Sequence, residues 1–239
     1  DSIVSRHELH TGPPAGIRSG ELEWPLPDPL LNFPSRFGEE HRSLGAQVGW
    51  FLQNTGGVAP PDALYIVYVG NNDLRDALAA LATDPTGATS GMILNAAITA
   101  IQDNLLALYA AGARHFLIPN APDLALLPAM RLQGPQVQAA GQQLSMNFNA
   151  GMALLLGGLE TSMPIRITRL DIFNLLTEAV AAPASFGFTD VEHSCITPGV
   201  LRHPFCASPD TYLFWDGIHP TRAAHAVFAQ RAYAALQLP

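Results

Sequence analysis

Leu64-Tyr65-Ile66-Val67-Tyr68-Val69, followed at once by Gly70-Asn71-Asn72-Asp73, is the clearest structural signal in this chain. A continuous run of apolar and aromatic residues, rich in β-branched side chains, is typical of a strand that is buried on both faces. Strands of this kind belong to parallel sheets, because helices cover both sides of such sheets. The glycine and the polar residues end the strand and lead into a helix that is expected to begin near Asp73.

The same alternation of strand and helix continues along the chain. Further buried strands are predicted at His115–Pro119 and around Ile165–Ile167, and a helix with Ser43 as its cap is predicted to end at Gly56-Gly57. The remaining predicted helices cover residues 91–111, 134–160 and 222–236. Strands that alternate with long helices need crossover connections, so the expected class is α/β, with a mostly parallel sheet between two helical layers. Residues 1–239 show no internal repeat or linker and are expected to form one domain, in which residues 1–42 have no readable pattern.

Composition excludes some classes of protein. Hydrophobic residues make up 48% of the 239 residues and charged residues only 13%, which is the balance of a folded chain. The net charge of −8 argues against nucleic acid as a partner. No apolar run approaches the ~20 residues that a membrane helix needs, so no transmembrane segment is expected.

Cys195 and Cys206 are the two cysteines of the chain and lie close together in a loop rich in proline and glycine. An even count at short spacing indicates a disulfide and an oxidising compartment, with two reduced thiols as the alternative. No signal peptide is visible, so an exported protein would be represented here in processed form. The protein is therefore expected to be secreted or periplasmic.

Near the C-terminus the chain reads Trp215-Asp216-Gly217-Ile218-His219-Pro220-Thr221. Histidine has a pKa close to working pH and serves as a general base, provided that a partner fixes its tautomer and ring direction. A carboxylate three residues upstream in a tight loop can reach back to do this. The alternative is an ordinary helix start, in which Pro220 occupies an early position and Thr221 or Asp216 acts only as a cap.

Two polar loops, Gly70–Asp73 and Asn120–Asp123, follow predicted strands. Ligands of open parallel sheets bind beyond the carboxyl ends of the strands, so both loops are expected at the rim that carries the site. The side-chain amide of Asn72 would there be a hydrogen-bond donor for a developing oxyanion. The alternative is turn chemistry alone, since Asn and Asp after glycine are common in turns.

Taken together, these strings resemble the GDSL, or SGNH, hydrolase family. Gly70-x-Asn72-Asp73 is similar to its third block and Asp216-x-x-His219-Pro220 to its fifth. Further likeness to the lipase-type branch lies in Ser43-Leu44-x-x-Gln47-Val48, Pro61-Asp62-Ala63-Leu64-Tyr65, Asn120-Ala121-Pro122-Asp123-Leu124, Pro209-Asp210-x-Tyr212-Leu213-Phe214-Trp215-Asp216 and the two cysteines. The resemblance covers roughly residues 43–236.

The resemblance implies a flavodoxin-like α/β/α fold with a five-stranded parallel sheet and no metal or organic cofactor. It implies an esterase or lipase that cleaves small-molecule or lipid esters through an acyl-serine. His219 would be the base, Asp216 its orienter and Asn72 an oxyanion donor. Acyl transfer and lysophospholipase action are alternatives within the fold, and a catalytically inactive binding module is the alternative outside enzymology. Tyr68, Leu74, Ile218 and Leu124–Leu127 are candidates either for an acyl pocket or for the core.

The nucleophile of the family sits in a Gly-Asp-Ser motif after the first strand. The chain opens Asp1-Ser2, so Ser2 is the expected nucleophile and its N–H an oxyanion donor, with the glycine and the preceding strand upstream of the printed sequence. Alternatives are Ser5 or Ser35 in its place, or a non-catalytic relative. Gly38 is the expected oxyanion glycine, with Gly45 as second choice.

Overall fold

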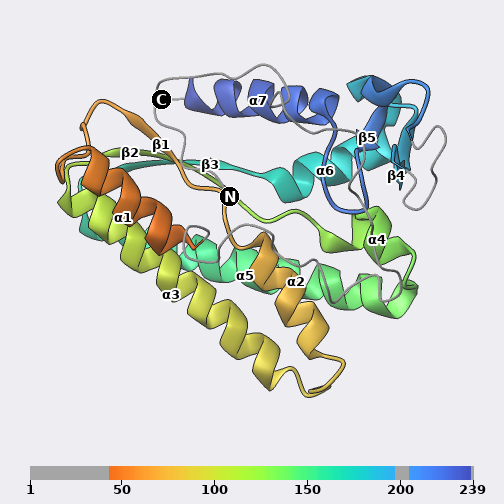
Figure 1. Ribbon diagram of the computed structural model, residues 1–239, viewed down its shortest axis with the longest axis horizontal. Coiled ribbons are helices and arrows are strands. Elements are labelled where there is room, and N and C mark those ends of the chain that lie inside the picture. Colours follow the sequence, from red (N-terminus) through yellow and green to blue (C-terminus); the bar gives the residue numbers. More distant parts are fainter. Residues whose placement is uncertain (1–42, 197–204, 238–239) are drawn as a thin grey trace, which may run out of the picture.

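A three-stranded parallel sheet forms the centre of the fold. The structure is a computed structural model and describes residues 43–196 and 205–237. Strands β1 (Leu64–Ile66), β2 (His115–Pro119) and β3 (Arg166–Leu170) lie in the order β1-β2-β3 and all run in the same direction (Figure 1). The strands predicted from the sequence are therefore confirmed, and in the described residues the sheet ends at β1 on one side and at β3 on the other.

Helices make the crossovers between these strands. Helices α2 (Asn71–Ala80) and α3 (Ala88–Ala110) connect β1 to β2, and α5 (Pro135–Ser162) lies between β2 and β3. All strand residues of β2 after His115 are buried, as expected for a central strand with helices on both faces. The carboxyl ends of the three strands consequently meet at one edge, from which α2 starts.

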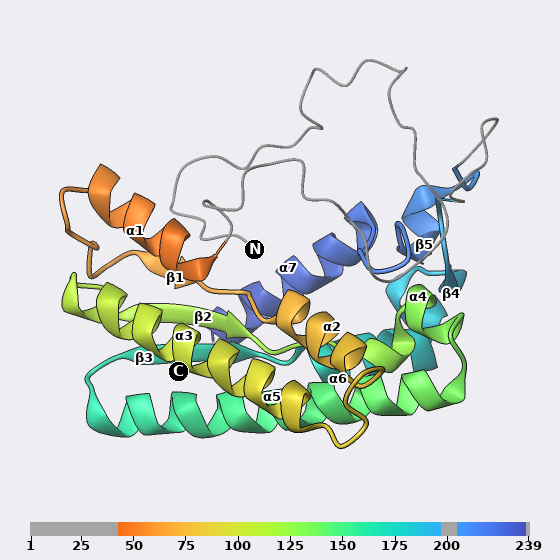
Figure 2. The same cartoon turned by 60° about the horizontal axis from the view of Figure 1, so that its bottom comes forward.

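The sheet separates two groups of buried side chains, one on each face. Tyr65, Phe116 and Ile167 belong to the larger core, which is shared with α1 (Leu44–Asn54), α2, α3 and α5. Leu117 and Leu170 belong to the smaller core, which is shared with α6 (Ile172–Ala181) and α7 (Arg222–Leu236). Figures 1 and 2 show these helices on opposite sides of the sheet. The predicted α/β/α class is thus confirmed.

The described strands do not form one sheet of five. Strands β4 (Asp190–Ser194) and β5 (Tyr212–Phe214) pair in parallel with each other as a separate two-stranded sheet. The chain leaves the main sheet directly after β3, because Asp171 caps α6 by accepting a hydrogen bond from the Asn174 N–H. Helix α7 packs against β3, and in the described residues β2 is the one strand that pairs with β3. In the described residues, three strands plus a separate pair therefore take the place of the expected single sheet of five.

Most predicted helix limits agree with the structure to within a few residues. Ser43 caps α1 by accepting from the Ala46 N–H at 3.1 Å, and α2 begins two residues before Asp73. The sequence patterns did not predict α6, β4 and β5, nor the short elements α4 (Pro128–Arg131), Leu124–Leu126, Pro183–Phe186 and Pro209–Thr211.

Helix α3 bears on the expectation that the chain has no transmembrane segment. Among the described residues it is the one helix that is long and apolar enough, by length and composition, to cross a bilayer. Its buried positions recur every three or four residues and form one stripe: Ser90, Leu94, Ala97, Ile101, Leu105 and Leu108. A single buried stripe is the pattern of a helix that covers a core, since its other face carries exposed polar residues such as Asn95.

Gly70 fixes the junction between β1 and α2. Its φ is +103°, and a Cβ atom there would lie 2.4 Å from Cζ of the buried Phe148 ring. Glycine is therefore required both for the left-handed backbone and for the close approach of α5. This junction sets where the first turn of α2, including Asn72, leaves the sheet.

We expect Gly70→Ala to lower the free energy of unfolding by about 2–5 kcal/mol, the sum of a left-handed alanine and an overpacked core. Gly87→Ala is the matched control, because Gly87 also has a positive φ (+77°) but a Cβ there would meet nothing closer than 3.8 Å. The control should cost only about 1–2 kcal/mol. Urea unfolding of both variants measures the difference, and equal losses would contradict the role assigned to Phe148.

Candidate active site

The loop that follows β5 folds back on itself. Phe214 and Pro220 form an antiparallel bridge, and the Trp215 N–H donates to the His219 carbonyl at 2.8 Å. The Thr221 N–H donates to the Leu213 carbonyl at 3.0 Å and closes the turn. The backbone from Trp215 to Thr221 is thereby held at both ends, and its tip presents Asp216 and His219.

Asp216 holds the His219 ring in one orientation. Its Oδ1 accepts from the N–H groups of Ile218 at 2.8 Å and His219 at 2.7 Å, and its Oδ2 lies 2.7 Å from His219 Nδ1. A carboxylate only accepts, so Nδ1 carries the proton that it donates to Oδ2. Nε2 is then the basic nitrogen, which is the tautomer that a general base needs.

The contact between Asp216 and His219 shifts the pKa values of both residues. Burial by itself raises the pKa of Asp216, but the hydrogen bonds from the His219 ring and from the N–H groups of Ile218 and His219 outweigh it and lower that pKa. The hydrogen bond to Asp216 raises the pKa of His219, and partial burial opposes this rise. Asp216 is consequently ionised at neutral pH, and the base form of His219 is reached at a somewhat higher pH than in a free histidine.

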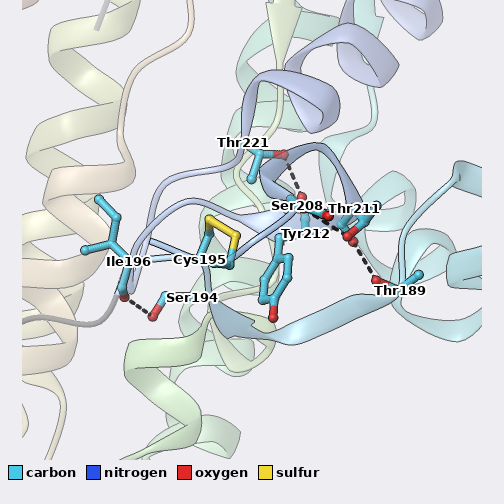
Figure 3. Close-up of a disulfide and its surroundings, with 9 residues drawn as sticks. Thr189, Ser194, Cys195, Ile196, Ser208, Thr211, Tyr212 and Thr221 are labelled. Carbon is cyan, nitrogen blue, oxygen red and sulfur yellow. Dashed lines mark hydrogen bonds between the residues drawn. A yellow bond between two sulfur atoms is a disulfide. The ribbon is translucent and has the colours of Figure 1, made fainter. Parts of the chain in front are cut away.

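Neighbouring elements hold the loop in place. The Ala129 N–H in α4 donates to the Gly217 carbonyl at 2.9 Å, and a Cβ at Gly217 would lie 3.2 Å from Ala129 Cβ. Thr221 is buried: its hydroxyl donates to the Tyr212 carbonyl (Figure 3) and accepts from the Ala224 N–H, so it caps α7. Capping by Thr221 and orientation by Asp216 are thus both present in this loop.

The predicted disulfide between Cys195 and Cys206 is confirmed. Figure 3 shows it beside the residues of β5, and Cys195 is buried directly after β4. A shallow hollow of about 400 Å³ lies beside Trp215 and is lined by Pro209, Asp210, Trp215, Thr221 and Arg222.

Asn72 lies in the first turn of α2 and is exposed. The N-terminal end of α2 and the loop between β5 and α7 are at the same end of the main sheet (Figures 1 and 2). This is the end at which the strands finish, where ligands of parallel sheets bind. The start of α2, which contains Asn72, and the loop that contains Asp216 and His219 therefore lie at the same end of the sheet.

The second polar loop of this rim has a structural task. Asn120 donates from Nδ2 to Asp171 Oδ1 at 2.9 Å and accepts from the Phe173 N–H at 3.0 Å, which ties β2 to the start of α6. Asp123 is buried and accepts from the Ala125 N–H and from Gln142 Nε2. The side chains of Asn120 and Asp123 therefore make structural hydrogen bonds, and we assign them no catalytic role.

Several candidate residues lie outside the described part of the chain. These are Ser2 and Gly38, with the alternatives Ser5 and Ser35, and the identity of the nucleophile and of the oxyanion glycine stays a prediction. Gly45, the second choice for that glycine, lies in the first turn of α1 next to Asn104 of α3.

Two described serines have hydroxyl groups engaged in structural bonds. Ser90 donates to the Ala77 carbonyl and Ser194 to the Ile196 carbonyl. Of the candidates for an acyl pocket, Leu74, Leu124 and Leu127 lie in the core, whereas Tyr68 and Ile218 are half-buried.

A second Asp–His pair, which was not predicted from the sequence, has similar geometry. Asp190 Oδ1 accepts from the N–H groups of Glu192 and His193, and Asp190 Oδ2 lies 3.0 Å from His193 Nδ1. The sequence pattern that could have predicted this pair is the same Asp-x-x-His spacing, although no proline and helix follow His193. The His193 side chain is 75% exposed on β4. In the described ranges, no three His, Cys, Asp or Glu side chains form a group that could hold a metal ion.

The described residues form an α/β protein in which a parallel sheet lies between helical layers, and the loop before α7 carries a histidine that Asp216 holds in one orientation. The profile of the family described as GDSL-like Lipase/Acylhydrolase matches residues 30–232, and the chain belongs to this family.

Relatives support the same assignment. A GDSL esterase/lipase of Arabidopsis thaliana is 26% identical over 228 residues, which cover 87% of this chain and 59% of the relative. Another from the same plant is 29% identical over 175 residues, 71% of this chain and 50% of the relative. The anther-specific proline-rich protein APG of Arabidopsis thaliana is 30% identical over 134 residues, 51% of this chain and 25% of the relative. The matched parts thus span between a quarter and about three-fifths of these relatives.

Proposed function

We propose that this protein hydrolyses carboxylic esters through an acyl-serine intermediate. The observation that carries the proposal is the Asp216–His219 pair, in which Nδ1 is bound and Nε2 is basic. The names of two relatives, GDSL esterase/lipase, support the reaction class. Small-molecule or lipid esters are the substrates that fit this class.

The first half of the reaction forms the acyl-enzyme. His219 Nε2 takes the proton of the serine hydroxyl, assigned to Ser2, as the serine oxygen attacks the ester carbonyl. The carbonyl π electrons move to oxygen, and this oxyanion accepts hydrogen bonds from the Asn72 amide and from the N–H groups of Ser2 and Gly38. Collapse breaks the bond to the alcohol, which leaves with the proton from His219.

The second half repeats these steps with water. His219 removes a proton from water, the resulting hydroxide attacks the acyl carbonyl, and the serine oxygen leaves as it regains the proton. Asp216 keeps the ring oriented and stabilises the imidazolium that forms twice per cycle. The ionised state of Asp216, favoured by its three hydrogen bonds, suits this task.

The disulfide supports a location outside the reducing cytosol, because such bonds persist in oxidising compartments. We therefore infer a secreted or periplasmic protein. Retention of the Cys195–Cys206 bridge in the natively isolated protein, read by non-reducing peptide mapping, tests this inference, and recovery of two free thiols would contradict it.

Hydrolysis of p-nitrophenyl esters with an initial burst of p-nitrophenol is the direct test of the proposed reaction, since a burst reports accumulation of an acyl-enzyme. Added alcohol as acceptor separates hydrolysis from acyl transfer. An intact, correctly processed protein without turnover on any ester would instead identify a binding module.

We expect Asn72→Ala to lower kcat by about 10²–10³-fold, as the loss of one oxyanion donor does. Asn72 is exposed, so the free energy of unfolding should change little. Asn95→Ala, which removes an exposed asparagine from α3, is the control and should retain full activity. Unchanged turnover in Asn72→Ala would remove this amide from the site.

A further inference from the structure

Residues on both sides of the disulfide contact the residue that precedes Asp216. The Cys195 N–H donates to the Phe214 carbonyl at 3.0 Å, and the Ile196 N–H donates to the Trp215 carbonyl at 2.8 Å. The segment after β4 therefore continues to pair with the chain beyond the end of β5. This pairing reaches the backbone of Trp215 but stops short of the two residues assigned to catalysis.

Phe205 contacts the same tryptophan from the other arm of the disulfide. Ile196 and Phe205 form an antiparallel bridge, and the Cys206 N–H donates to the Cys195 carbonyl at 2.7 Å. The Phe205 ring stacks on Trp215 with centroids 5.5 Å apart and 22° between the planes. Phe205 nevertheless remains 55% exposed, so it contributes little to the core.

Trp215 contacts both the segments joined by the disulfide and the loop that carries the Asp216–His219 pair. Its carbonyl binds Ile196, its N–H binds the His219 carbonyl, and its ring binds Phe205. A movement of Trp215 would shift both Asp216, the next residue, and the His219 backbone. The hydrogen bond between Asp216 Oδ2 and His219 Nδ1 is 2.7 Å long and sets the orientation of the ring. Such a shift would change the geometry of this hydrogen bond and with it the ring orientation.

We propose that Phe205 is a positioning residue: by stacking on Trp215, and held there by the Cys195–Cys206 disulfide, it fixes the loop that carries Asp216 and His219. The expected effect of Phe205 on kcat rests on the proposed hydrolysis. The orientation of the Asp216–His219 pair, however, can be measured without turnover. Phe205 is not among the residues that line the hollow beside Trp215.

The test compares Phe205→Ala with Phe205→Trp, which restores a stacking ring, and with Tyr233→Ala, which removes another exposed aromatic side chain from α7. We expect Phe205→Ala to lower kcat about 10-fold with KM within 2-fold of the wild type, since displacement by a fraction of 1 Å is costly in a catalytic site and 1 Å costs about 10²-fold. Phe205→Trp and Tyr233→Ala should keep wild-type kcat.

A second readout does not depend on turnover. The bond to Asp216 raises the pKa of His219, so loosening it should move that pKa down toward the ordinary histidine value. Among the described residues, Asp216 is the charged group that acts on this ring, and His225 of α7 is a titratable neighbour whose own pKa is lowered by burial and by His219. NMR titration of His219 should therefore give a lower pKa in Phe205→Ala than in wild type, and the acid limb of kcat/KM should move to lower pH.

The outcomes separate the two proposals. A wild-type kcat and an unchanged His219 titration in Phe205→Ala would overturn the positioning role. A raised KM with unchanged kcat and titration would also overturn it and assign Phe205 to substrate binding. Absence of ester hydrolysis in the wild type would refute the proposed function alone, because the NMR titration still decides whether Phe205 positions the pair.

Discussion

His219→Ala should lower kcat/KM for a carboxylic ester by about 10⁴-fold or more, because a serine hydrolase without its base retains only the contribution of the oxyanion hole and substrate binding. The side chain of His219 is 67% exposed, so its removal should leave the midpoint of thermal unfolding nearly unchanged. Steady-state kinetics together with a thermal melt measures both quantities on the same preparation.

The second Asp–His pair supplies the control for this experiment. His193 has the same sequence spacing from its aspartate, the same two backbone hydrogen bonds to that aspartate, and a similarly exposed ring. The two variants thus make the same local change. His193→Ala should retain wild-type kcat/KM, because His193 is not assigned to the reaction. Loss of activity in His193→Ala but not in His219→Ala would transfer the base to β4 and contradict the assignment.

Asp216→Asn should lower kcat by about 10³–10⁴-fold while the loop keeps its shape. Oδ1 of the asparagine would still accept from the N–H groups of Ile218 and His219, so its NH₂ group must face the imidazole. An NH₂ group donates, and the ring would respond by placing its proton on Nε2 and leaving Nδ1 as acceptor. Nε2 could then no longer remove a proton from the serine.

The matched variant is Asp190→Asn, which makes the same change in the second pair and should leave kcat unchanged. Kinetics of both variants with one ester substrate, and far-UV circular dichroism to confirm the fold, complete the comparison. An Asp216→Asn enzyme within 10-fold of wild type would mean that the carboxylate does not determine the tautomer of His219.

The sequence predicted those parts of the fold that have a local pattern. β1 and β2 are continuous or nearly continuous apolar runs, and the first helix has its cap at Ser43, so each could be placed from neighbouring residues. β3 contains Arg166, Thr168 and Arg169, and its position was predicted only approximately, from Ile165 and Ile167. The Asp216–His219 contact was predicted for the same reason, since both residues lie on one short loop. The disulfide followed from the cysteine count.

What was missed depends on contacts between distant segments. Only Asp171 separates β3 from α6, and the apolar residues on both sides of it give no local sign that a strand ends and a helix begins there. The pairing of β4 with β5 joins segments about 20 residues apart through a shifted register, which no local pattern reveals. The docking of Gly217 on Ala129 and the stacking of Phe205 on Trp215 likewise arise only in the folded chain.

Covalent labelling with a fluorophosphonate, followed by mass spectrometry of the modified peptide, tests most directly whether the Asp216–His219 pair activates a serine. We expect one labelled peptide, which carries the probe on Ser2, and labelling that is abolished in His219→Ala but not in His193→Ala. A label on Ser35 or on another serine, or equal labelling of the wild type and His219→Ala, would contradict it.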